Sequence, residues 1–402
     1  MRRSGDFLGL AGLLVAAVPS SHSAAATGQA TSWRAAWLTA MQRPNANPNW
    51  SRQGFADQSV RQIVRLTAGG AKLRIRLSNQ YGDRPLRVTG ATVARAAEGA
   101  GVESGSTRAV KFGGAGAVSV AVGAQVASDA IALPAMGSGV RLAVTLYFAE
   151  ATGPATFHEY GAIGASYRAA GDQREDASGA AYRESGGGWY FLAGVDTVAS
   201  GEGGVVAFGD SVTNGYRTTP GRRYPDLLAG RLAAAGRPMP VLNAGLGGNR
   251  LLTDSACSGE RGLARFARDV LDQPGITTAI VLIGVNDIGS TEVPAITSAQ
   301  LIAGYRTLIQ EAHSRGIRII GVTIPPFRGA TAHTARSEQL WTTVNTWIRT
   351  SGEFDATADF ASSLADPADP TRLSPGYDSG DHLHPNALGY RAMADTLDLA
   401  TL

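Results

Sequence analysis

The sequence predicts an α/β protein in which an all-β, jelly-roll-like sandwich precedes a parallel sheet that is covered by helices on both faces. Three observations carry this prediction. Residues 32–200 alternate apolar and polar side chains in short runs between Gly and Pro, which is typical of antiparallel strands. After a glycine-rich joint, residues 203–402 alternate short apolar runs with amphipathic segments, which is typical of a three-layer α/β/α sheet. A chain of 402 residues is long enough for two such cores.

The first 26 residues are typical of a secretory signal peptide. The basic start MRR precedes the apolar run FLGLAGLLVAAV, which is too short to span a bilayer comfortably. Small residues in SSHSAAA suit cleavage between positions 23 and 26. We therefore expect residues 1–26 to be removed and the mature protein to be secreted without a membrane anchor. A retained signal anchor is the alternative.

The net charge, the single cysteine and one histidine indicate which partners and which chemistry are not expected. The formal net charge of +3 argues against a nucleic acid or a membrane surface as partner. Cys257 is the only cysteine, so no intramolecular disulfide can form. No base lies beside it in TDSACSGERG, and Cys257 is interpreted as incidental. His158, in TFHEYG, is interpreted as structural.

One segment of the first half predicts a β-hairpin. Residues 59–82, SVRQIVRLTAGGAKLRIRLSNQYG, contain two alternating runs around a Gly-Gly turn. In the second run Leu73, Ile75 and Leu77 point to one side and basic residues to the other, as in a half-buried strand. The basic side could bind an anion, but we interpret it as a solvated outer face. Its members are Arg61, Arg65, Lys72, Arg74 and Arg76.

The second half predicts four parallel strands and four helices that largely alternate along the chain. The expected strands are VVAFG, MPVLNAG, TTAIVLIG and IRIIGVTIPP. The expected helices are YPDLLAGRLAAAG, TSAQLIAGYRTLIQEAHSRG, SEQLWTTVNTWIRTSG and PNALGYRAMADTLDL. Because ligands of open parallel sheets bind at the carboxyl ends of the strands, the residues that follow each strand are the candidates for a site.

Residues at these strand ends predict nucleophilic catalysis. Ser211 follows the first strand, and a serine hydroxyl needs an adjacent base to attack a substrate. His384 could be that base, and Asp381, three residues earlier, could hold its imidazole in one tautomer. A turn at Gly-Asp-Ser and a metal site at Asp-x-x-His are the alternatives. His382 lies one step away and is expected to be exposed.

A developing oxyanion needs preorganised donors. The backbone N–H of Ser211, at the strand-to-helix corner, is one candidate. A glycine N–H from GLGGN is a second, and Gly245, Gly247 and Gly248 compete for that role. Asn286 in GVNDIG can add a side-chain N–H. An ordinary loop and an Asx turn are the alternatives for these two motifs.

Taken together, the motifs resemble the SGNH, or GDSL, hydrolases. The family's four blocks correspond here to FGDSVTNG, NAGLGGN, GVNDIG and DHLHPN. The resemblance implies Ser211 as nucleophile, Asp381 and His384 as its triad partners, and an oxyanion hole of Ser211, Gly248 and Asn286. It implies no cofactor and no metal. Many relatives have Asp where this chain has Asn214, outside the triad. Thr213 stands where the second glycine of a Gly-x-Ser-x-Gly motif would be, which argues against the nucleophile turn of the α/β-hydrolase fold.

The whole chain resembles secreted two-domain bacterial members that are likened to xylan-associated esterases and arylesterases. The resemblance implies a secreted serine esterase whose substrate is a small-molecule or polysaccharide ester. The motif loops GDSVTNGYRTTPGRR, GLGGNRLLTDSACSGERG and PGYDSGDHLHPN are polar and glycine-rich and offer little apolar surface for a long acyl chain, so we expect short-chain, chiefly acetyl, esters. One alternative is a lipase, lysophospholipase or thioesterase for longer acyl chains. A carbohydrate-binding protein with a degenerate hydrolase domain is an alternative of another class.

Overall fold

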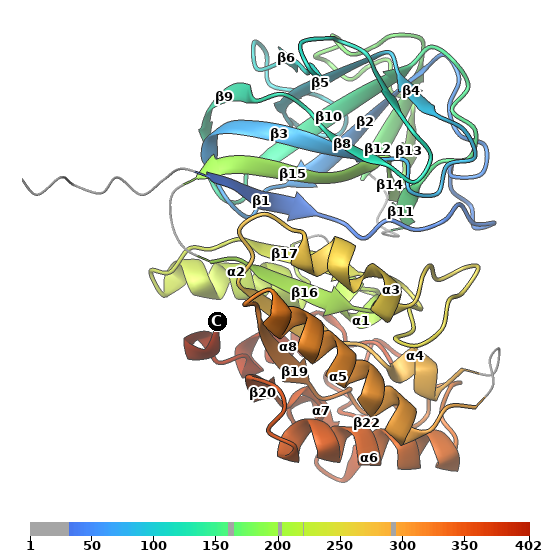
Figure 1. Ribbon diagram of the computed structural model, residues 1–402, viewed down its shortest axis with the longest axis vertical. Coiled ribbons are helices and arrows are strands. Elements are labelled where there is room, and N and C mark those ends of the chain that lie inside the picture. Colours follow the sequence, from blue (N-terminus) through green and yellow to red (C-terminus); the bar gives the residue numbers. More distant parts are fainter. Residues whose placement is uncertain (1–31, 160–164, 200–202, 220, 291–294) are drawn as a thin grey trace, which may run out of the picture. The chain divides into compact units, whose positions relative to one another are not determined.

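The computed structural model describes residues 32–159, 165–199, 203–219, 221–290 and 295–402 (Figure 1). The predicted signal peptide, residues 1–26, lies outside these described residues. These described residues group into one compact unit. Within this unit we call residues 32–199 the β region and residues 203–402 the α/β region. The division into separate domains stays a prediction.

Two antiparallel sheets form most of the β region. The first sheet runs β1 (Ser32–Leu38), β15 (Leu192–Ala199), β3 (Gly70–Ser78) and β8 (Gln125–Ala127), with β9 (Ile131–Met136) also paired to β3. The second runs β13 (Glu184–Gly186), β12 (Ser166–Ala170), β2 (Gln58–Arg65), β10 (Arg141–Phe148), β5 (Gly90–Arg95) and β6 (Arg108–Ala109). Short ladders join β11 (Phe157–Glu159) to β14 (Gly188–Tyr190) and β4 (Leu86–Val88) to β7 (Val118–Val120). This confirms a β-rich first half, whereas the jelly-roll-like sandwich stays a prediction.

The hairpin predicted over residues 59–82 is wrong in its pairing. Its two runs form β2 and β3, but β2 pairs with β10 and β12, whereas β3 pairs with β15, β8 and β9. The turn between them therefore carries the chain from one sheet to the other. Leu73, Ile75 and Leu77 are fully buried in a core that both sheets share. Facing the other sheet buries more apolar surface than an isolated two-stranded ribbon would.

The prediction of a solvated basic face is correct for Lys72, which is exposed, and wrong for Arg61. The Arg61 side chain is buried, and its guanidinium donates to two loop carbonyl oxygens at 2.7 and 2.8 Å. Arg76 is also largely covered, and its Nε lies 3.1 Å from a carboxylate oxygen of buried Asp196. The alternation in the sequence did not reveal these partners, which are loop carbonyl oxygens for Arg61 and, for Arg76, Asp196 of β15 together with Gln273 of the α/β region.

A parallel sheet forms the centre of the α/β region. Its spatial order is β17 (Val241–Gly245), β16 (Val205–Gly209), β18 (Thr278–Leu282), β19 (Arg318–Val322) and β20 (Ala356–Ala358). The first four lie within the predicted runs, and β20 was missed because ATA is short and carries no apolar run. A small antiparallel ladder joins β21 (Ala365–Asp366) and β22 (Asp369–Leu373).

Helices cover both faces of this sheet, as predicted. Val206 and Phe208 of β16 pack in one apolar core with Leu308 of α5 (Ser298–Ser314), while Val205 and Ala207 pack in another with α2 (Tyr224–Ala234) and α8 (Ala387–Thr396). The helices are α1 (Ser211–Asn214), α2 (Tyr224–Ala234), α3 (Gly262–Phe266), α4 (Val285–Ile288), α5 (Ser298–Ser314), α6 (Ala335–Thr350), α7 (Phe360–Leu364) and α8 (Ala387–Thr396). A π-helical turn, Ala267–Leu271, follows α3, and a 3₁₀ turn, Leu399–Thr401, follows α8. In the described ranges no helix is long and apolar enough to cross a bilayer.

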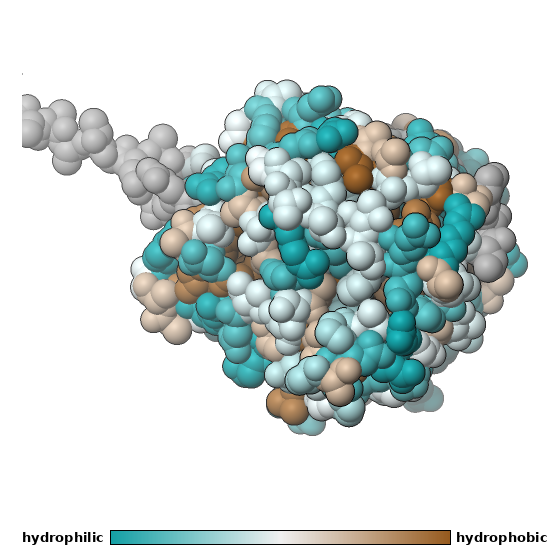
Figure 2. Space-filling model, turned by 90° about the horizontal axis from the view of Figure 1, so that it is seen from below, coloured by the Kyte–Doolittle hydropathy of each residue, from teal (hydrophilic) through white to brown (hydrophobic). Residues whose placement is uncertain are grey.

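The β region and the α/β region contact each other along β1. The Ala35 N–H donates to the Pro274 carbonyl oxygen at 2.9 Å. Ala35 and Leu38 are buried in the apolar core that also contains Leu242 of β17. Two strands of different regions thus share one core. On the face of the molecule seen in Figure 2, hydrophobic residues are interspersed with hydrophilic ones, which is typical of a solvent-exposed surface.

Candidate active site

The predicted site residues follow the carboxyl ends of three neighbouring strands. Gly209 of β16 is in register with Gly245 of β17 and with Leu282 of β18. The three strands therefore end level with one another. Ser211 comes two residues after the first of them, the GLGG loop directly after the second, and Asn286 shortly after the third. The topology brings the three motifs to one edge of the sheet, as predicted.

A tight corner places Ser211 at the first position of α1. A side chain at Gly209 would collide with the Leu282 carbonyl oxygen, because its Cβ would lie 2.2 Å from that atom. Asp210 caps the helix, since its Oδ1 accepts from the Val212 N–H at 3.0 Å. The helix lasts one turn and ends at Gly215, whose φ of +92° favours glycine. The nucleophile candidate is thus held between a strand end and a short capped helix.

Ser211, His384 and Asp381 form one continuous hydrogen-bonded chain. The Ser211 Oγ lies 2.8 Å from His384 Nε2, and His384 Nδ1 lies 2.9 Å from Asp381 Oδ2. The other Asp381 oxygen accepts from the backbone N–H groups of Leu383 and His384, at 3.1 and 2.8 Å. The His384 Nδ1 hydrogen therefore points to the carboxylate, which leaves Nε2 free to accept the serine proton.

The surroundings favour a neutral His384 and an ionised Asp381. Burial lowers the pKa of His384, and the bond with Asp381 raises it only partly back. For Asp381, partial burial works toward a higher pKa, but the hydrogen bonds from His384 outweigh it and lower the pKa to about 2. A neutral imidazole beside a carboxylate is the state that a general base requires.

This arrangement predicts the acid limb of the pH profile. Because His384 must be neutral to accept a proton, kcat/KM should rise with pH through a midpoint below the ordinary histidine value of about 6.5. Arg217 lies 3.6 Å from Asp381, and its charge also lowers the pKa of His384. An Arg217→Gln variant should therefore move the limb to higher pH, whereas Arg217→Lys should leave it in place. A limb that is unchanged in Arg217→Gln would contradict this account.

Two of the three competing glycines remain as oxyanion donors. The Gly245 N–H is already used, because it donates to Asn243 Oδ1 at 2.9 Å. Within the described part of the chain, the N–H groups of Gly247 and Gly248 have no acceptor. Both residues lie in a turn closed by the Asn249 N–H to the Leu246 carbonyl oxygen, at 3.1 Å. Gly248 has a φ of +69°, which favours glycine at this position.

The Asn286 side chain is oriented by a hydrogen bond that uses one of its two amide hydrogens. Its Nδ2 donates to the Asn249 carbonyl oxygen at 3.0 Å, so the second hydrogen remains for a ligand. The Ser211 N–H, at the start of α1, likewise has no acceptor among the described residues. The predicted donors therefore keep hydrogens for an oxyanion at the strand ends.

Replacing Asn286 should mainly slow the chemical step. Asn286→Ala should lower kcat by about 10²- to 10³-fold with little change in KM, because an oxyanion donor acts on the transition state. Steady-state kinetics on a soluble ester would measure both constants. A strong rise in KM with unchanged kcat would instead make Asn286 a substrate-binding residue.

Sequence reasoning missed a buried arginine that joins the strand ends. Arg265, in α3, has no solvent exposure, and its guanidinium donates to the carbonyl oxygens of Gly209 and Ala244 at 2.7 and 2.8 Å. It also donates to Asn249 Oδ1 at 2.9 Å and to Asp269 Oδ2 at 3.0 Å. One cation thus ties β16, β17 and the oxyanion loop together. The only signal in the sequence was a basic residue within the otherwise apolar stretch GLARF.

Asp287 was also missed as a positioning group. Its two oxygens accept from the backbone N–H groups of Leu251 and Leu252 at 2.7 and 2.9 Å. It therefore holds the loop after β17 against α4, which carries Asn286. Burial raises the pKa of Asp287 to about 6. Burial likewise raises the pKa of Asp210, the α1 cap, to about 7.

The remaining predicted residues lie outside this network. His382 is half exposed and bonds its own partner, with Nδ1 2.6 Å from Asp378 Oδ2. Cys257 is exposed and unpaired by disulfide. Across the described ranges, no three His, Cys, Asp or Glu side chains gather in a group that could hold a metal ion.

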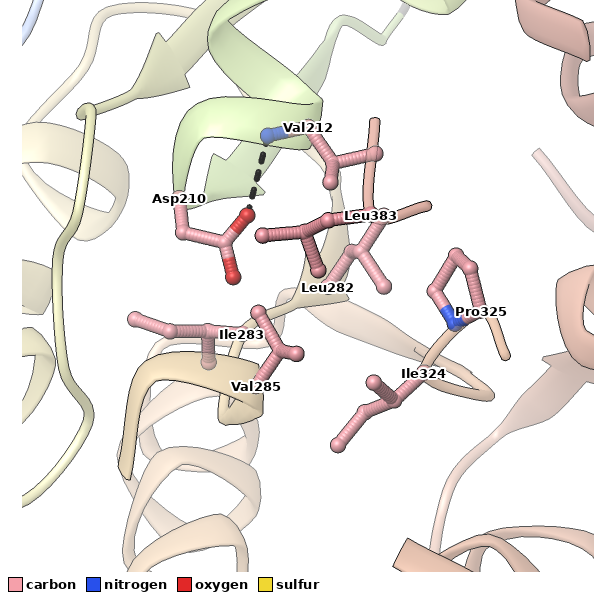
Figure 3. Close-up of a pocket in the computed structure, with 8 residues that line it drawn as sticks. All are labelled: Asp210, Val212, Leu282, Ile283, Val285, Ile324, Pro325 and Leu383. Atoms are coloured by element: carbon pink, nitrogen blue, oxygen red, sulfur yellow. Dashed lines mark hydrogen bonds between the residues drawn. The ribbon is translucent and has the colours of Figure 1, made fainter. Parts of the chain in front are cut away.

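A small cavity lies among residues that neighbour the motifs in the sequence. Its volume is about 10 Å³. Figure 3 shows apolar side chains around it, with Asp210 bonded to the Val212 N–H at one side. The lining residues are Asp210, Val212, Leu282, Ile283, Val285, Ile324, Pro325 and Leu383. Val212 follows Ser211, Val285 precedes Asn286 and Leu383 precedes His384, so sequence neighbours of all three residues line the cavity.

Comparison with known proteins gives one family. Residues 207–392 match the model of the GDSL-like Lipase/Acylhydrolase family. Solved structures similar to part of the chain include a G-D-S-L family protein from Desulfitobacterium hafniense DCB-2, with 22% identity, a TM-score of 0.38, and coverage of 49% of this chain and 97% of that chain. An aryl esterase from M. smegmatis has 17% identity and a TM-score of 0.40, and the match covers 48% of this chain and 95% of that chain. An acetyl xylan esterase has 20% identity and a TM-score of 0.38, and the match covers 48% of this chain and 96% of that chain. No curated protein matches the chain.

Proposed function

Because residues 207–392 belong to the GDSL-like lipase/acylhydrolase family, we propose that the protein is a secreted serine esterase that hydrolyses short-chain, chiefly acetyl, carboxylic esters. The observation that carries the proposal is the hydrogen-bonded chain from the Ser211 Oγ through His384 to Asp381, at 2.8 and 2.9 Å. A serine hydroxyl that is aligned with a neutral imidazole and an ionised carboxylate is the arrangement for nucleophilic acyl transfer.

The reaction follows from these contacts. The Ser211 Oγ attacks the ester carbonyl carbon while His384 Nε2 takes the serine proton, and the carbonyl oxygen becomes an oxyanion. The N–H groups of Ser211, Gly248 and Asn286 stabilise that charge. His384 then gives its proton to the departing alkoxide, which leaves an acyl group on Ser211. Water, deprotonated by the same imidazole, releases the acid and restores the serine.

The preference for a short acyl group is supported by the small cavity that sequence neighbours of Ser211, Asn286 and His384 line. Its volume of about 10 Å³ is near the lower limit for one group of the size of a water molecule or a methyl, and the walls include apolar side chains such as Val285 and Ile324. A longer chain would gain only about 0.8 kcal/mol for each methylene that found an apolar surface. Within this cavity there is no such room, so we expect acetyl esters to bind best.

A cyclic alcohol such as a sugar or an aryl ring is the second part of the proposal. His384 must reach the leaving oxygen, and the Tyr216 ring lies beside the imidazole, with centroids 4.6 Å apart. Tyr216 is 48% exposed, so it offers an aromatic surface where the alcohol would leave. The basic and apolar start of residues 1–26 supports secretion, which suits a substrate outside the cell.

A chain-length series tests the proposal. We expect kcat/KM to be highest for p-nitrophenyl acetate and to fall through the butyrate and decanoate. Ile324→Ala should enlarge the cavity and move the preference toward butyrate. Ile320→Ala removes the same atoms from the other face of the sheet and should leave the preference unchanged. A preference that rises with chain length in the unmodified protein would favour the lipase alternative.

A further inference from the structure

We propose that His158 of the β region is a positioning residue for the reaction, because it holds the nucleophile helix α1 through Asn214. The inference rests on the proposed function, since it assigns a role to a residue that acts through Ser211. It makes the β region a part of the catalytic scaffold.

The His158 ring is fixed on the side of the β region. It lies in β11, and the residue is 1% exposed. Its Nδ1 lies 2.6 Å from the Ala40 carbonyl oxygen, which can only accept, so this nitrogen carries the hydrogen. The ring also stacks on Trp189 of β14, with centroids 5.8 Å apart and an interplanar angle of 29°. A ring held by a strand neighbour and a carbonyl oxygen has little freedom to turn.

The same strand reaches Asn214, the last residue of α1, at two points. His158 Nε2 lies 3.1 Å from Asn214 Oδ1. Asn214 Nδ2 donates to the backbone carbonyl oxygen of Glu159 at 3.2 Å. Asn214 is buried, so water does not compete for these contacts. Because the hydrogen of the neutral His158 ring lies on Nδ1, Nε2 can only accept, and it bonds Asn214 when the amide turns its NH₂ group toward the ring. In either orientation of the amide, Asn214 donates one hydrogen bond to β11, to His158 Nε2 or to the Glu159 carbonyl oxygen.

The bond between Asn214 and β11 matters because α1 is too short to be stable by itself. A helix of four residues is a single turn, and isolated turns are unstable without external contacts. On the other side, Asn243 Nδ2 donates to the Thr213 carbonyl oxygen at 2.7 Å. Ser211 is the first residue of this turn, so a shift at Asn214 changes the 2.8 Å contact between the Ser211 Oγ and His384.

A second contact between the two regions offers a matched control. Arg76 Nη2, from β3, donates to Gln273 Oε1 at 2.6 Å. Gln273 precedes β18 and therefore lies toward the amino end of the sheet, whereas Ser211 lies at the carboxyl end. A substitution at Gln273 should weaken the contact between the two regions without disturbing α1.

A double-mutant cycle tests the proposal. His158→Phe keeps a ring on Trp189 and Asn214→Leu keeps the volume, but each removes the polar contact. We expect each to lower kcat on p-nitrophenyl acetate by about 10- to 100-fold, with KM changed little, since small misplacements of a nucleophile cost rates of that order. The double variant should be no slower than the slower single variant, because both act through one contact. Gln273→Leu should lower the melting temperature but leave kcat unchanged.

A second readout separates this inference from the proposed function. Labelling of Ser211 by a fluorophosphonate, followed by mass spectrometry, reports the reactivity of the serine without an ester substrate. It should slow in His158→Phe and Asn214→Leu alike. Unmodified protein that labels at Ser211 but hydrolyses no ester would overturn the proposed function alone. Unchanged labelling and kcat in either folded variant, additive losses in the cycle, or an equal loss in Gln273→Leu would overturn the role of His158. Asn214→Leu carries the test if His158→Phe does not fold.

Discussion

Ser211→Ala should lower turnover of an acetate ester by about three or more orders of magnitude while the protein stays folded. The physical reason is the loss of the attacking oxygen, which lies 2.8 Å from the His384 base. His384→Ala and Asp381→Ala should cause losses of similar order, and the losses should not add, because the three groups act as one unit. Initial rates, with circular dichroism as a check of folding, measure the effect.

The neighbouring histidine is a matched control. His382 lies two residues from His384 and also bonds an aspartate, but its ring is half exposed and it makes no contact with Ser211. His382→Ala should therefore retain turnover within about twofold, as is usual for a surface change away from a site. Near-normal turnover in Ser211→Ala, or a loss in His382→Ala as large as that in His384→Ala, would contradict the assignment.

Arg265→Met should destabilise the protein by about 3–5 kcal/mol, because it removes one partner of a buried ion pair. Asp269 would lose the guanidinium at 3.0 Å, and the carbonyl oxygens of Gly209 and Ala244 would lose their donor. Urea unfolding followed by tryptophan fluorescence would measure the free energy of unfolding. We also expect a lower kcat, since both strand ends and Asn249 lose a common anchor.

A surface arginine gives the comparison for that experiment. Arg306 pairs with Glu353 at 2.7 Å, but half of its side chain is exposed. Arg306→Met should cost at most about 1 kcal/mol, because exposed ion pairs contribute little. Equal effects of the two substitutions would mean that burial of Arg265 does not govern its contribution.

The catalytic motifs were predictable because their geometry is local. Asp381 and His384 lie on one loop three residues apart, and Ser211 lies directly past an apolar strand. The rule that parallel sheets carry their sites at strand ends then places them together, although Ser211 and His384 are 173 residues apart in the chain.

Features that depend on distant partners were not predictable. Alternation in residues 59–82 indicated strands, but it does not say which strand pairs with which, so the hairpin was wrong. Arg265 has the sequence environment of an ordinary helix residue, and its partners lie on other elements. His158 had no visible partner because Asn214 meets it only after the two regions fold together.

The burial of Ala35 and Leu38 beside Leu242 of β17 has a consequence for the timing of folding. The first described strand completes a core whose other members lie between Val206 and Ala361, and such high contact order slows folding. Loop closure over that length must precede much of the gain from burial. During synthesis from the amino terminus, β1 therefore lacks its contact with β17 until well over half of the sequence has been made. Nascent fragments that end before residue 241 should leave this apolar edge open to aggregation.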